Sequence, residues 1–169
     1  MTTVNTDVGD SCHCQRARVG CMAMGTWSTE LLGNDSALDT LGEIARGDFS
    51  FADLAEELQA DYIDNDAGVA VLTLIEVALA VRGRRELPQD DEDNLTIDLV
   101  SALVDDERAG WLLVQADRVL GPGSEIYDLW REAGDETLHE WLSNASAAID
   151  DLRRELGLSS STEATRGHA

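Results

Sequence analysis

The chain has 169 residues, of which 43% are hydrophobic, and its 34 Asp and Glu residues against 12 Lys and Arg residues give a net charge of -22. This length suits one domain with its own core, and such a negative field repels nucleic-acid phosphate and anionic lipid, so we expect no direct nucleic-acid or membrane binding. The three cysteines all lie in the first 21 residues, which argues against a disulfide framework and favours a reducing, cytoplasmic location.

The first half of the chain predicts three helices in succession. Apolar residues recur at helical spacing from Asn34 or Asp35, either of which is a natural N-cap, to a stop at Gly47. A second helix follows the capping residue Ser50 and carries its apolar pattern to Tyr62. Residues 65–82 are apolar almost all round, which is typical of a helix surrounded by others.

The second half predicts four more helices after a polar break. Residues 83–94 contain glycine, proline and a run of acidic residues, and therefore predict a solvated loop. Helical spacing resumes over residues 95–106 and 107–120, and two further helices follow Ser124. We therefore predict an all-α fold, a single compact bundle of about five to seven helices around the apolar helix 65–82.

Residues 24–41, "MGTWSTELLGNDSALDTL", read like the beginning of a protein although 23 residues precede them. The stretch resembles the opening M-G-x-W-G-x-G-x-F-x-N-D-x-A-x-D of a bacterial family known as domain-of-unknown-function family 4259. The matching positions are Met24, Gly25, Trp27, Asn34, Asp35, Ala37 and Asp39, whereas Ser28, Glu30 and Leu32 depart from the pattern. The resemblance implies a small helical protein and brings no activity with it.

The same stretch suggests where the domain begins. We expect a helical domain over residues 24–157, with residues 1–23 as a disordered N-terminal extension or the product of a misassigned start. Translation could begin at Met1, Met22 or Met24. Residues 158–169 are polar and predict a disordered tail.

Three carboxylates are candidates for chemistry. Asp35 and Asp39 stand one helical turn apart, and Glu76 lies in the most apolar helix. We favour structural roles: Asp35 caps the first helix, Asp39 accepts a hydrogen bond from Trp27 or from backbone, and Glu76 pairs with an arginine of another helix. The arginines considered for that pair are Arg108, Arg118 and Arg131. Gly25, Trp27 and Asn34 complete this set of structural motif residues.

A cluster near the N-terminus combines residue types that zinc prefers. It consists of Cys12, His13, Cys14 and Cys21. Adjacent ligands on an extended stretch point in alternate directions, and closed zinc sites use pairs separated by two to four residues, so the spacing argues against a metal site. We predict no metal and no cofactor.

The leading functional prediction is a non-catalytic binding protein whose partner is a basic protein. The sequence has no Gly-rich phosphate loop and no nucleophile motif, so we assign no catalytic residue. We expect the acidic loop residues Asp90, Asp91, Glu92 and Asp93 to contribute to partner binding. The alternative is an enzyme that uses Asp35, Asp39 and Glu76 with a divalent cation. The sequence indicates no oligomeric state.

Overall fold

The computed structural model describes residues 28–87 and 95–158, and over these residues the chain forms seven helices and no strand. The prediction of an all-α fold is confirmed. The helices are α1 (Asp35–Arg46), α2 (Phe51–Glu57), α3 (Asn65–Val81), α4 (Ile97–Leu103), α5 (Asp106–Val119), α6 (Glu125–Ala133) and α7 (Asp135–Glu155).

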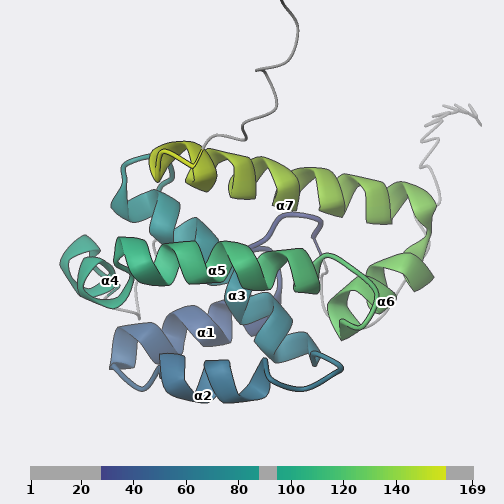
Figure 1. Ribbon diagram of the computed structural model, residues 1–169, viewed down its shortest axis with the longest axis horizontal. Helices are drawn as coiled ribbons and strands as arrows, with labels where there is room; N and C mark the ends of the chain where they lie inside the picture. The colour runs from purple at the N-terminus through teal and green to yellow at the C-terminus, as the bar shows by residue number, and fades with distance from the viewer. Residues whose placement is uncertain (1–27, 88–94, 159–169) are drawn as a thin grey trace, which may run out of the picture.

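The predicted central helix is α3, which contacts all six other helices. In Figure 1 it runs behind α5, with α7 along the upper edge of the molecule and α1 and α2 along the lower edge. Thirteen of its 17 residues are buried, because apolar side chains cover its whole circumference. The remaining helices bury one face each against α3 or its neighbours, which leaves their acidic faces exposed.

Most of the described helices begin at a residue whose side chain accepts a hydrogen bond from an N–H of the first turn, and capping residues of this kind can be recognised in the sequence. Asn34 is the N-cap of α1, because its backbone is extended and its Oδ1 accepts from the N–H of Ala37 at 2.9 Å. The expectation that Asp35 caps this helix is wrong: Asp35 is the first helical residue, where its carboxylate faces the positive end of the helix dipole. Ser50 caps α2 as predicted, by accepting from the N–H of Asp53.

The helix α2 ends at Glu57, five residues before the expected end at Tyr62. The guanidinium of Arg118 on α5 donates to the carbonyl of Leu58 and, at 2.9 Å, to that of Ala60. These bonds satisfy carbonyls at the end of α2 that have no helical partner, so the chain can leave the helix there. The segment that follows forms a parallel bridge between Ile63 and Ser124.

Ser124 stands at the predicted N-cap position of α6, although no side-chain cap hydrogen bond forms there among the described residues. The start of α6 is held by the facing loop instead. The N–H of Glu125 donates to the carbonyl of Ile63, and the Glu125 carboxylate accepts from the N–H of Asn65, both at 2.8–2.9 Å. The first turns of α3 and α6 are thereby joined.

The expected extension over residues 1–23 lies outside the described residues, as does the tail beyond residue 158, so the expected domain limits remain predictions. Within residues 28–87 and 95–158 no helix is both long and apolar enough to cross a bilayer.

Candidate functional site

An acidic cleft opens between α1, α2 and the first turn of α3. Its volume is about 430 Å³, and α1 and α2, which form its walls, lie side by side along the lower edge of Figure 1. Six carboxylate side chains line it, together with three hydroxyl groups and three apolar side chains. The carboxylates are Asp39, Glu43, Asp48, Asp53, Glu57 and Asp66.

Local sequence explains why the carboxylates face one another. Asp39 and Glu43 stand four residues apart on α1, and Asp53 and Glu57 stand four residues apart on α2, so each pair follows one edge of its helix. Gly47 adopts the left-handed conformation, φ +76°, that ends α1 and turns the chain back toward α2. Each helix buries its apolar face in the core, and the two acidic edges then border the same space.

The hydroxyl groups of the cleft are engaged in structural hydrogen bonds. Ser36 donates from Oγ to Asp66 at 2.9 Å, and Thr40 donates from Oγ1 to the carbonyl of Ser36 at 2.9 Å. Ser50 accepts the capping hydrogen bond of α2. No histidine of the described residues lines the cleft, so within this part of the chain none of these hydroxyls has the adjacent base that would activate it as a nucleophile.

Burial and the surrounding negative charge make Glu57 harder to ionise. The pKa of Glu57 is raised above 4.5, first because the side chain is partly desolvated and then because Asp64, Asp53, Asp66 and Glu43 place negative charge around it. An ionised Glu57 is therefore stabilised by any cation that enters the cleft.

The described residues supply almost no such cation. All 12 basic residues of the chain are arginines, and nine of them lie in the described part. Arg46 is the only one of the nine that forms an ion pair with a cleft carboxylate, at 3.5 Å from Asp48, and both of these side chains are exposed. The other eight form ion pairs, hydrogen bonds or ring contacts elsewhere. Within the described structure, five of the six carboxylates have no ion-pair partner.

Of the three carboxylates considered for chemistry, the cleft contains only Asp39. Asp35 lies at the exposed start of α1, and Glu76 lies near the other end of α3. The predicted contact of Asp39 with Trp27 falls outside the described residues, as do Gly25, Asp90, Asp91, Glu92 and Asp93 and the cluster of Cys12, His13, Cys14 and Cys21.

Glu76 pairs with an arginine, but not with Arg108, Arg118 or Arg131 as expected. Its Oε2 lies 3.2 Å from Arg85, whose guanidinium also contacts Asp151 on α7 at 2.8 Å. The chain turns back at Gly83, φ +70°, just beyond α3, and this turn returns Arg85 to the helix it has left. Burial raises the pKa of Glu76 although Arg85 opposes the shift.

No group of three or more His, Cys, Asp or Glu side chains is placed to hold a metal ion in the part of the chain that the structure describes. The cleft carboxylates are spread over α1, α2, the loop between them and the first turn of α3 rather than gathered around one point.

The sequence prediction missed Glu43, Asp53 and Glu57 as site residues. Their signal in the sequence was a pair of acidic residues four positions apart within each of two successive helices. Such a pair also fits an ordinary solvent-exposed helix face. Only the approach of α1 to α2 turns two such faces into one cleft.

The fold and this site define a small all-α protein with a carboxylate-lined cleft. A family model described as Domain of unknown function (DUF4259) matches residues 25–144, and the chain belongs to this family. The match includes every residue that lines the cleft. No curated protein and no solved structure gives a significant match.

Proposed function

We propose that the protein is a non-catalytic binding protein that recognises a basic protein, and that the acidic cleft receives a lysine or arginine side chain of this partner. The observation that carries the proposal is the group of cleft carboxylates that lack ion-pair partners within the described structure. A guanidinium or ammonium group would supply the missing positive charge and form charge-assisted hydrogen bonds with them.

The arrangement favours binding over catalysis. The cleft hydroxyls form hydrogen bonds with backbone and with Asp66, and among residues 28–87 and 95–158 no histidine lines the cleft. Asp35, Asp39 and Glu76, the carboxylates of the alternative enzyme hypothesis, lie at three different places on α1 and α3.

The wider charge of the chain supports the same partner. A net charge of -22 raises the rate of encounter with a cationic surface and opposes phosphate-rich ligands. The loop residues Asp90, Asp91, Glu92 and Asp93 remain a proposed second contact. They would contribute to steering, whereas the cleft would hold one cationic side chain.

The proposal is tested with a dye-labelled arginine–glycine peptide as the probe, by fluorescence anisotropy at low and physiological salt. The double substitution Asp53→Asn and Glu57→Gln should weaken binding about tenfold, since two partly exposed charge pairs contribute together about 1.4 kcal/mol. The difference from the unmodified protein should shrink as salt rises.

A matched control changes the same charge far from the cleft. Glu136 and Glu140 are exposed, stand four residues apart on α7, and lie on the opposite edge of the molecule from α1 and α2 (Figure 1). Glu136→Gln with Glu140→Gln should alter peptide binding less than twofold, an effect of net charge alone. Equal weakening by the two double variants would show that the cleft has no special role.

A further inference from the structure

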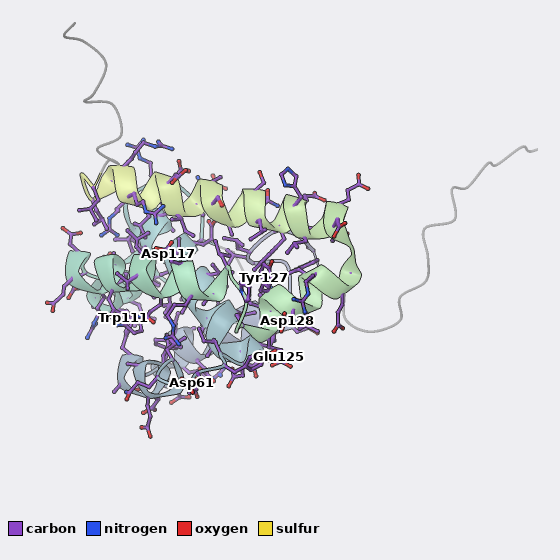
Figure 2. The ribbon with its side chains drawn as sticks, turned by 45° about the vertical axis from the view of Figure 1, so that its right-hand side comes forward. Asp61, Trp111, Asp117, Glu125, Tyr127 and Asp128 are labelled. Atoms are coloured by element: carbon purple, nitrogen blue, oxygen red, sulfur yellow. The ribbon has the colours of Figure 1, made fainter. Side chains whose placement is uncertain are left out.

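A second hollow lies on the other side of α2, between this helix and α5. Two adjoining cavities of about 410 and 430 Å³ share Ala55 and Trp111 as wall residues and together form one groove. We call it the aromatic groove and define it by Phe51, Ala55 and Leu58 on the α2 side and Arg108, Trp111 and Arg118 on the α5 side. In Figure 2, Trp111 lies between α5 and the helix beneath it.

The groove presents apolar surface to solvent. The rings of Phe51 and Trp111 meet edge to face at 6.1 Å, and both side chains are only partly buried. Val114, one turn further along α5 and outside the lining of the groove, is 62% exposed. Partly exposed aromatic side chains in a hollow are typical anchor points at protein interfaces.

The two arginines at the groove form contacts within the protein. Arg108 stacks over the Phe51 ring at 4.9 Å and donates to the carbonyl of Leu103 at the end of α4. Arg118 donates to Leu58 and Ala60 at the end of α2. Because helix C-termini carry partial negative charge, these guanidinium groups mainly balance helix ends. Arg108 and Arg118 are therefore already engaged within the protein, and the groove does not favour an acidic ligand.

Carboxylates border the groove instead. Asp53, Glu56 and Glu57 are exposed along α2, so this helix is an acidic ridge between the aromatic groove and the acidic cleft. Asp105 and Glu107 line the groove at the start of α5, whereas Asp53 and Glu57 line the acidic cleft on the far side of α2. An apolar floor with acidic borders is complementary to a segment that is apolar on one face and basic along its edges.

We propose that the aromatic groove binds a basic amphipathic helix of the partner protein, with its apolar face on Trp111 and Ala55 and its cationic side chains reaching over α2 into the acidic cleft. This inference rests on the proposed function, since it describes the same partner. A second copy of this chain is a poor occupant, because two molecules with a charge of -22 repel each other.

Two dye-labelled peptides with equal numbers of arginines serve as probes: a leucine–arginine peptide that forms an amphipathic helix, and the arginine–glycine peptide. The unmodified protein should bind the amphipathic peptide about tenfold more tightly, because only that peptide buries apolar side chains in the groove. Ala55→Arg should fill the groove and abolish this preference.

Ala52→Arg is the matched control, because Ala52 is exposed on the same helix and lines neither hollow. It adds the same charge and should keep the tenfold preference. Thermal unfolding followed by circular dichroism checks that both variants retain the fold, which is expected because arginine is a good helix former, Ala52 is exposed and the side chain of Ala55 borders an open groove.

Equal binding of the two peptides to the unmodified protein would overturn the inference, as would equal effects of Ala55→Arg and Ala52→Arg. Sedimentation measures the oligomeric state of the unmodified protein and of Ala55→Arg. A dimer that is lost in Ala55→Arg would also overturn the inference, since the groove would then be an interface between two copies. The proposed function is contradicted by a different result: equal binding of the arginine–glycine peptide to the unmodified protein and to the cleft variant Asp53→Asn with Glu57→Gln.

Discussion

Replacement of Trp141 by alanine is expected to lower the free energy of unfolding by about 3–5 kcal/mol, the range found for large aromatic side chains removed from cores. Trp141 on α7 is 2% exposed, and its ring stacks on that of Trp130 on α6, with centroids 6.0 Å apart and planes at 22°. The substitution removes this stacking and leaves a cavity where α6 meets α7. Urea unfolding followed by far-UV circular dichroism measures the loss.

The control for Trp141 is Trp111→Ala, which removes the same side chain from a partly exposed site. We expect a loss of about 1 kcal/mol, because the Trp111 side chain is only partly buried and lines the groove. Equal losses for the two variants would contradict the assignment of Trp141 to the core and of Trp111 to a surface groove.

Arg85→Gln is expected to cost about 2 kcal/mol at neutral pH. Loss of one member of a fully buried ion pair costs about 3–5 kcal/mol, and the 36% exposure of the Arg85 side chain reduces that figure through solvent screening. The substitution leaves the 14% exposed Glu76 side chain and Asp151 without their shared cation. Glu76→Gln should cost less, because Arg85 then keeps Asp151.

The cost of Arg85→Gln should fall as the pH is lowered from neutral and the carboxyl groups of this cluster take up protons. Burial raises the pKa of Glu76 in the folded state, so protonation of this group favours the folded protein, and loss of Arg85 raises that pKa further. The hydrogen bond from Arg85 holds the pKa of Asp151 low, and the stability this gives is present above its unfolded pKa and lost as the pH falls. Both effects reduce the penalty in acid.

Arg84→Gln provides the control for this pH dependence. Arg84 pairs with Glu155 at 2.7 Å, and its side chain is 59% exposed. We expect a loss of about 0.5 kcal/mol that changes little with pH. Chemical unfolding of the two variants between pH 4 and 7 measures the difference. A pH-independent loss for Arg85→Gln would contradict the role assigned to Glu76.

The helices could be predicted because their signals are local. Asn34 and Gly47 bound α1, Ser50 starts α2, and the uninterrupted apolar run of α3 marks it as central; the structure agrees in each case. The end of α2 at Glu57 could not be predicted, since it depends on Arg118, which is 60 residues away from Leu58.

The site depends on tertiary contacts to a greater degree. Asp39 was singled out from its spacing to Asp35, yet its neighbours across the cleft, Asp53 and Glu57, lie on another helix. The arginine that pairs with Glu76 was sought on a different helix, whereas the turn at Gly83 brings Arg85 back from the same chain segment. Spacing within one helix identifies a charged edge but not the surface that faces it.

The pKa of Glu57, followed by NMR of its side-chain carboxyl carbon, tests the acidic cleft most directly. In the free protein it should lie above 4.5, because of partial burial and the surrounding carboxylates. Saturation with the arginine–glycine peptide should lower it, since a cation in the cleft stabilises the ionised form. A peptide that binds while the pKa of Glu57 stays unchanged would contradict the account.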